Sequence, residues 1–496
     1  MRALLVAMLT VGLTQAAATQ ESAAPTIGQG GSKGVVIRGQ APVATDVLKV
    51  KLPRPIEGDL PNGLHLMVLE DHRAPMLSFQ LQIQGAGGFY DPAESTGLAN
   101  FTASLLREGS ITKTAPQIAR ELDTMAASLF AGAGQSSQAA TINGSCLAEH
   151  VDRLLTMTSE IVLHPAFAQE EIDRVKVQRK AQLMQQRTSP GFLASEMFAK
   201  VTYGTHPAGR VSATPAFINN VTRDDLVTFH RLHYVPDFAV LAIAGDITFA
   251  QARTKAEAAF GAWPKSGQKA PATSEPNDLA RAGVFLVDRP NSVQTNFIVG
   301  TQAIARTSPD YDAVEVMNKV IGGGPTGRLF MNLREDKGFT YGAYSYVQAA
   351  TYRGTWLAST QVRTDVTGPA LKELVGEITR LRDQTVPAAE LDTAKRALVA
   401  NYALSLESAD RLLDYAITSW IYHLPADYWD RRPAALLAVT PEQVQTAART
   451  YLTPARLQIV AVGTGATIGS ILESYGPLNT FDVDGKAASH VSDSGK

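Results

Sequence analysis

The nine histidines of this sequence are its main candidates for metal chemistry, because the chain holds only one cysteine, Cys146. A single cysteine excludes an intrachain disulfide, a cysteine-based zinc site and an iron–sulfur cluster. His230 and His233 lie three residues apart on a predicted helix and could share a metal ion. No carboxylate follows at a ligand spacing, so we interpret both as structural or surface residues. The other histidines are scattered and are interpreted in the same way.

Arg334 and Tyr341, seven positions apart, form a second group with chemical potential. We predict a helix that ends near Arg334, a break at Gly338 and a strand that Tyr341 opens. In that arrangement the two side chains can converge on one pocket. The alternative is a surface arginine at a helix end and a packed strand tyrosine. Spacing alone favours this alternative.

Alternating and helical patterns predict the elements that carry these residues. Leu77, Phe79, Leu81 and Ile83 alternate with polar residues, which indicates a strand with one buried face. After the cap at Thr114, apolar residues recur at helical spacing at positions 118, 122, 125 and 129. Further elements are predicted as helices at 148–163, 168–187, 310–321, 369–383 and 387–404, and as strands at 283–288, 293–300, 341–350 and 354–363.

The chain divides into two similar halves. Its 496 residues are 45% hydrophobic with a net charge of −2, which fits globular domains and gives no general attraction to nucleic acid. A Pro- and Ser-rich linker is predicted at 264–282, between domains at 49–263 and 283–475. Val221-Thr222 and Val439-Thr440 each begin a capped helix followed by a Pro turn and an apolar strand, at a constant offset of 218 residues. This favours an internal duplication.

The two ends of the chain differ from the domains in composition. Residues 1–18 have a positive start, a short apolar run and small residues, which is typical of a cleaved secretory signal peptide. We predict a flexible segment at 19–48 and a polar tail at 476–496. A periplasmic or secreted location follows, with no membrane span after removal of the signal.

The sequence blocks around residue 100 resemble the pitrilysin/insulinase family of zinc peptidases, the inverzincins. These blocks are Asn62-Gly63-Leu64, Gly88-Phe89-Tyr90-Asp91-Pro92 and Thr96-Gly97-Leu98-Ala99. In that family the last block leads into the zinc motif H-x-x-E-H. Here its three functional positions hold Asn100, Ala103 and Ser104, and the position of the further Glu ligand aligns with Ala181 or Gln182. The resemblance spans about residues 50–475 and implies a degenerate site that holds no metal.

The resemblance also implies a fold and residue roles. The fold is α+β, with two homologous α/β-sandwich halves of the LuxS/mitochondrial-processing-peptidase type that together form half of a clamshell. Arg334 would hold substrate carbonyls, and Tyr341 would stabilise the oxyanion in the active site of a second chain. Gly322, Gly323 and Gly324 stand where a zinc-free processing-peptidase subunit carries a glycine-rich substrate loop. They equally fit a plain helix–strand connection, and they form no phosphate loop.

We therefore expect a zinc-free, substrate-binding subunit of a heterodimeric metallopeptidase, which is inactive alone. The partner would be a homologous subunit with H-x-x-E-H and the zinc, and the substrate a peptide or an unfolded protein. One alternative is a non-enzymatic scaffold or peptide-binding protein of the same fold. Another is an autonomous peptidase with a different metal set.

Overall fold

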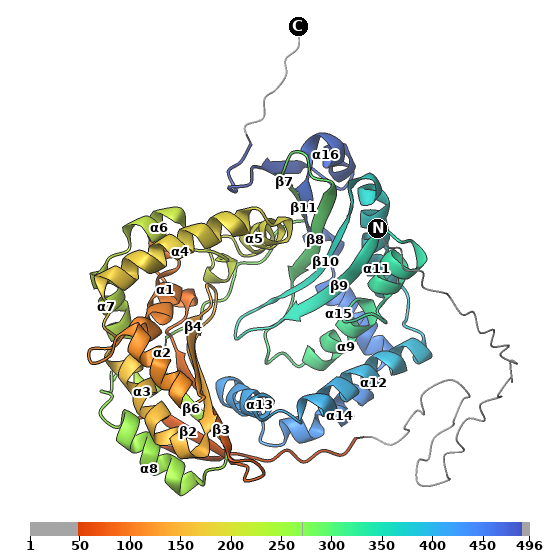
Figure 1. The fold of residues 1–496 in the computed structure, drawn as a ribbon. Helices are drawn as coiled ribbons and strands as arrows, with labels where there is room; N and C mark the ends of the chain where they lie inside the picture. The colour runs from red at the N-terminus through yellow and green to blue at the C-terminus, as the bar shows by residue number, and fades with distance from the viewer. Residues whose placement is uncertain (1–47, 270, 489–496) are drawn as a thin grey trace, which may run out of the picture. The chain divides into compact units, whose positions relative to one another are not determined.

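The computed structural model describes residues 48–269 and 271–488, which contain two six-stranded sheets (Figure 1). The predicted signal peptide at 1–18 and nearly all of the predicted flexible segment at 19–48 lie outside these residues. In the part of the chain that is described, none of the helices combines the length and the hydropathy of a membrane span.

The first sheet has the strand order β1-β2-β6-β3-β5-β4. Its strands are β1 (Ile56–Asp59), β2 (His65–Glu70), β3 (Met76–Gln84), β4 (Ser128–Ala133), β5 (Ala139–Leu147) and β6 (Ala239–Gly245). β2 and β6 run parallel, and the other neighbours are antiparallel. The alternation predicted for residues 77–83 is confirmed, because Leu77, Phe79, Leu81 and Ile83 are buried in one core.

The second sheet repeats this plan in the order β12-β7-β11-β8-β10-β9. Its strands are β7 (Gly283–Asp288), β8 (Gln294–Gln302), β9 (Thr340–Gln348), β10 (Thr355–Arg363), β11 (Gln458–Gly463) and β12 (Leu478–Phe481). A parallel pair again occupies the second and third positions, here β7 and β11, but the edge strand β12 is also parallel to β7, whereas β1 is antiparallel to β2. Thr222 and Thr440 both cap their helices with a reciprocal hydrogen-bonded box, so the local structure repeats as the 218-residue offset predicts.

Helices cover the sheets. In the first half they are α1 (Leu98–Leu105), α2 (Ala115–Thr124), α3 (Val151–Leu163), α4 (Gln169–Arg187), α5 (Pro190–Tyr203), α6 (Pro215–Asn220), α7 (Arg223–His233) and α8 (Phe249–Phe260). In the second half they are α9 (Tyr311–Ile321), α10 (Arg328–Phe330), α11 (Thr367–Asp383), α12 (Ala388–Ser405), α13 (Ala409–Tyr422), α14 (Tyr428–Ala438), α15 (Pro441–Tyr451) and α16 (Gly465–Glu473).

Two helices pack on the sheet of the opposite half (Figure 1). α5 lies against β8 and β11, where Met197 and Phe198 share a buried cluster with Val460. α13 lies against β3 and β6, where Leu413 and Ile417 share a cluster with apolar residues of β2 and β6. Each sheet therefore buries one face under helices of its own half, and a helix from the other half covers the inner strands of its second face.

Two segments differ from the sequence prediction. The helix predicted to reach position 129 ends at Thr124, because Ala126 adopts a left-handed conformation with φ of 47° and turns the chain into β4, which contains Leu129. The segment predicted as a polar tail contains β12. This strand pairs in parallel with β7, and its Phe481 ring packs 6.5 Å from the ring of Phe285.

Candidate functional site

Arg334 lies in a single π-helical turn, Met331–Asp336, that ends just before β9. Gly338 follows with φ of 63° and donates its N–H to the Arg334 carbonyl at 3.1 Å, which closes the turn. The side chain of Arg334 is 46% exposed and lies over the Phe330 ring at 4.8 Å. Its nearest carboxylate is that of Glu335, at 3.5 Å. The guanidinium therefore stacks on an aromatic ring and remains partly open to solvent.

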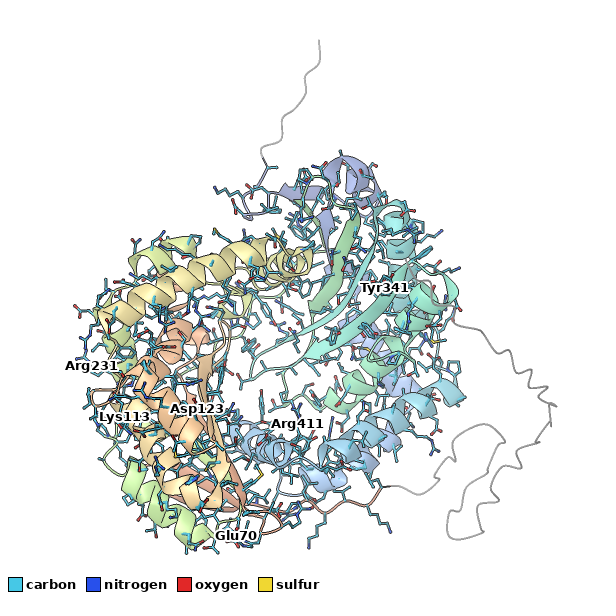
Figure 2. All side chains as sticks on the ribbon, in the orientation of Figure 1. Glu70, Lys113, Asp123, Arg231, Tyr341 and Arg411 are labelled. Atoms are coloured by element: carbon cyan, nitrogen blue, oxygen red, sulfur yellow. The ribbon has the colours of Figure 1, made fainter. Side chains whose placement is uncertain are left out.

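Tyr341 lies in a β-bulge near the start of β9. Tyr341 and Gly342 together oppose the single residue Gln361 of β10, because the register shifts between the flanking pairs. The Thr340 hydroxyl fixes the bulge: it lies 2.7 Å from the Gln361 carbonyl and accepts the Gly342 N–H at 3.0 Å. The bulge leaves Tyr341 92% exposed at an edge strand (Figure 2). Such exposure is unusual for an aromatic residue on a strand.

The three glycines connect α9 to the segment that carries Arg334. Gly322 accepts the N–H of Ser345 at 2.9 Å, and a Cβ at Gly322 would meet that nitrogen at 2.7 Å. The buried Lys319 donates to the Gly323 carbonyl at 2.8 Å, and burial lowers the pKa of this lysine. The Ser345 contact attaches the turn to β9, and the Lys319 contact attaches it to α9. They explain glycine at position 322 without a substrate, and a substrate role of the turn stays a prediction.

The positions of the zinc motif lie on α1 and do not fit zinc. The Asn100 amide donates to the Ala133 carbonyl of β4 at 2.7 Å, and Ala103 is buried without a donor atom. The Ser104 hydroxyl donates to the Phe101 carbonyl at 2.8 Å, so it forms a helix back-bond. Neutral amide and hydroxyl groups engaged in this way are poor zinc ligands. Among the residues described, no cluster of three His, Cys, Asp or Glu side chains offers another metal site.

A cavity of ≈ 230 Å³ opens beside Asn100. Gln182, from α4, lines it, which brings two predicted zinc positions together, whereas Ala181 is not among its lining residues. Arg179 lies one helical turn before Gln182 and is the only charged side chain among the described residues that line this cavity. Arg179 was not predicted from the sequence, because only the fold brings α4 to α1. The available signal was that Arg179 lies three residues before Gln182, so the two side chains are neighbours on one face of the helix.

Asp91 fixes the start of α1. Its carboxylate accepts the N–H groups of Gly97 and Ala99 at 2.7 and 2.9 Å. Arg210 binds the Asp91 backbone carbonyl at 2.6 Å and approaches the same loop. Burial raises the pKa of Asp91 to about 6, in spite of these backbone hydrogen bonds, which oppose the shift. The buried carboxyl thus anchors the helix on which the zinc positions lie.

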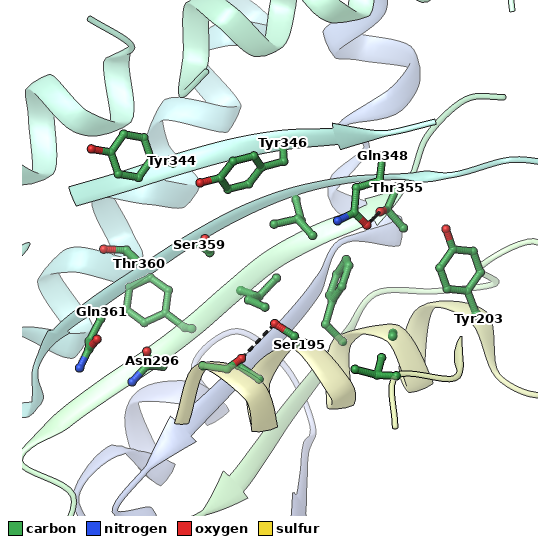
Figure 3. Close-up of a pocket in the computed structure, with 18 of the residues that line it drawn as sticks. Ser195, Tyr203, Asn296, Tyr344, Tyr346, Gln348, Thr355, Ser359, Thr360 and Gln361 are labelled. Atoms are coloured by element: carbon green, nitrogen blue, oxygen red, sulfur yellow. Dashed lines mark hydrogen bonds between the residues drawn. The ribbon is translucent and has the colours of Figure 1, made fainter. Parts of the chain in front are cut away.

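A second cavity, of ≈ 620 Å³, lies between α5 and the face of β8, β10 and β9 (Figure 3). Tyr344, Tyr346 and Gln348 line it from alternate positions of β9, and Ser195 and Tyr203 line it from α5. None of its described lining residues carries a charge. Neutral polar groups beside aromatic rings can contact the backbone of a peptide, and they do not favour peptides of positive or of negative charge. Sequence patterns did not reveal this cavity, because α5 and the strands belong to different halves.

The paired histidines and the cysteine are structural. The His230 and His233 rings bind different carbonyls, those of Val162 and Gly85, each at 2.7 Å. Burial lowers the pKa of both imidazoles, so they pack as neutral rings. Cys146 is buried, and burial raises the pKa of its thiol to about 11, which leaves it unreactive.

Comparison with known protein families matches both halves. A model of the insulinase peptidase family, M16, matches residues 66–216, and a model of the M16 inactive domain matches residues 220–398. A Bacillus subtilis protein described as an uncharacterized zinc protease is 25% identical over 359 residues, which is 70% of this chain and 84% of the relative. A similarly described Streptomyces coelicolor protein is 25% identical over 364 residues, 72% of this chain and 78% of the relative.

Solved structures have the same fold. The crystal structure of a peptidase M16 inactive domain from Pseudomonas fluorescens is 27% identical, has a TM-score of 0.77, and covers 82% of this chain and 97% of its own. A protease from Helicobacter pylori has a TM-score of 0.77 at 17% identity, covering 83% of this chain and 100% of its own, and supports the fold alone.

Proposed function

Since the chain belongs to the insulinase family of peptidases, family M16, we propose that it is a zinc-free, substrate-binding subunit of a heterodimeric metallopeptidase. The partner is a homologous subunit that carries H-x-x-E-H and holds the zinc. Arg334 and Tyr341 of this chain complete the active site of the partner, where peptides or unfolded proteins are hydrolysed. The apolar start of the sequence leads us to propose that the protein is periplasmic or secreted.

The exposure of Tyr341 carries this proposal. A bulge fixed by the Thr340 hydroxyl holds the tyrosine 92% exposed, and among the described contacts its hydroxyl has no hydrogen-bond partner in its own chain. Bulges at sheet edges commonly direct a side chain toward a functional site. Arg334, on the turn just before β9, likewise lacks a strong carboxylate partner in the described chain. By contrast, the zinc positions on α1 are filled by groups that do not fit zinc.

The chemistry assigned to the pair follows from its groups. Arg334 donates charge-assisted hydrogen bonds to substrate carbonyls and orients the peptide. The Tyr341 hydroxyl donates to the oxyanion of the tetrahedral intermediate, a contact made in the transition state rather than with the substrate carbonyl. The uncharged cavity between α5 and β9 extends from the same strand and would contact the rest of the peptide.

The test uses the purified chain with a zinc-bearing M16 subunit from the same host. Alone, each chain should cleave a quenched fluorescent peptide poorly, and the mixture should be active. Tyr341→Phe should lower kcat of the mixture by about 10²–10³-fold, with little change in KM, because it removes one oxyanion donor. Tyr475→Phe is the matched control, since this tyrosine packs against the core of the second half and should leave activity unchanged.

Full turnover with Tyr341→Phe would show that the assigned role is wrong. Retrieval of the chain from its host with only unrelated, non-peptidase partners would instead favour the scaffold alternative. Cleavage by the pure chain, together with stoichiometric metal, would favour an autonomous peptidase.

A further inference from the structure

Arg179 is a cation without a counter-charge. It lies in the cavity between α1 and α4, and burial lowers its pKa without a compensating acidic neighbour. Among the described residues its hydrogen-bond partner is the neutral Gln182, whose Oε1 accepts from Nη1 at 2.9 Å. Arginine stays charged in proteins, so the desolvated charge is present and unpaired. Partial burial of an unpaired charge costs free energy, and an anion in the cavity would offset that cost.

The remaining polar groups of the cavity are neutral amides. Asn100, Gln135, Gln182 and Gln186 line it together with Ser212. The Oε1 atom of Gln135 is buried and has no hydrogen-bond partner among the described residues. A buried acceptor without a partner is costly and rare in native structures. The cavity therefore offers a cation for an anionic group and an acceptor for an N–H group.

We propose that this cavity binds the C-terminal residue of a peptide, with its carboxylate on Arg179 and its amide N–H on Gln135. The guanidinium presents a planar pair of N–H donors that matches a carboxylate. The terminal residue of a peptide carries its amide N–H and its carboxylate on the same carbon, Cα, and these are the two groups that Gln135 and Arg179 lack as partners. Asn100 and Gln182, two positions that align with the family's zinc ligands, line the same cavity as this arginine.

A chain end supplies both the carboxylate and the N–H group that this cavity can bind. The volume of the cavity, ≈ 230 Å³, accommodates at least one residue. An acidic side chain offers the same carboxylate, and the experiment separates the two sources. The proposal is independent of the pairing with a zinc-bearing subunit, because binding is measured on this chain alone.

The experiment measures fluorescence anisotropy of short alanine peptides labelled at the N-terminus. One peptide has a free C-terminal carboxylate, the second has a C-terminal amide, and the third has a C-terminal amide after a final glutamate. The wild-type chain should bind the free acid at least about tenfold more tightly than either amide. The plain amide has no carboxylate for Arg179, and the glutamate amide carries its carboxylate at the end of a side chain, away from the N–H group that Gln135 accepts.

Arg179→Gln should abolish the preference for the free acid. Lys180→Gln is the matched control, since it removes the same charge from an adjacent, exposed residue that does not line the cavity. If the wild-type chain bound the free acid and the plain amide equally, the proposal would be overturned. A preference for the free acid that persisted in Arg179→Gln would overturn it as well. Equal binding of the free acid and the glutamate amide would refute selection of the chain terminus.

Discussion

Asp91 shows how one buried carboxyl group controls the position of the helix that carries the positions of the zinc motif. The Gly97 and Ala99 N–H groups at the start of α1 have no partner within the helix, and the carboxylate accepts both. The surrounding core nevertheless penalises the negative charge, and this desolvation dominates the pKa. A group that must remain charged to cap two amides is therefore held in a site that favours its protonated form.

This conflict predicts a pH dependence of stability. The folded pKa of about 6 lies above the ordinary value of 3.8, so the carboxyl contributes stability that is fully present below about pH 4. That contribution is lost as pH rises through about 6, and it amounts to at most about 3 kcal/mol. Asp91→Asn does not titrate, so the free energy of unfolding of wild type relative to this variant should fall between about pH 4.5 and pH 7.

Urea unfolding of both proteins at the two pH values measures the difference. A difference that stays constant would mean that the carboxyl has an ordinary pKa in the folded protein. A difference that rises with pH would mean that the backbone hydrogen bonds outweigh the desolvation.

At the scale of the elements, the contact of α5 with the second sheet depends on one glycine of β8. A Cβ at Gly300 would lie 2.6 Å from the Phe198 ring of α5 and 2.6 Å from the Trp356 carbonyl of β10. Both neighbours are confined, since Phe198 is buried and the carbonyl belongs to a central strand. The absence of a side chain therefore allows the helix to approach the sheet closely.

Gly300→Ala should accordingly destabilise the protein by about 1–3 kcal/mol, because the new methyl group must displace α5 or the strand. Gly376→Ala on α11 is the matched control: nothing lies within 4 Å of its added Cβ, and alanine at this exposed helical position should stabilise the protein by about 0.5–1 kcal/mol. Urea unfolding gives both values. An unaffected or more stable Gly300→Ala protein would contradict the close approach.

The contact of α5 with the second sheet could not be predicted from the sequence, whereas several individual strands could. Strands such as β3 and β7 were predicted within one or two residues, because burial of one face imposes a visible alternation or a bounded apolar run. The apolar face of α5, with Met197 and Phe198, carries no information about which sheet it covers. Arg179 escaped prediction for the same reason, since its cavity forms only when segments distant in sequence meet.

At the scale of the whole molecule, the exchange of α5 and α13 makes the halves mutually dependent. Without α13, the buried residues Met67 and Val240 of the first sheet would face water, and without α5 so would Ile298 and Val460 of the second. Exposed apolar faces of this kind cause association or loss of structure. The duplicated halves therefore behave as one folding unit, although their sequences suggest two domains.

This dependence predicts the behaviour of a chain cut in its linker. A protease site inserted at Gly267, where the backbone has φ of 65° and no neighbour crowds an added Cβ, should be cleaved without disturbing the fold. The two fragments should then remain together in size-exclusion chromatography without denaturant, and they should unfold in one transition, because each sheet is covered by a helix of the other fragment. Fragments produced separately should be insoluble and should recover solubility only when produced together. Two independently folded, monomeric fragments would contradict the exchange and would restore the two-domain interpretation of the sequence.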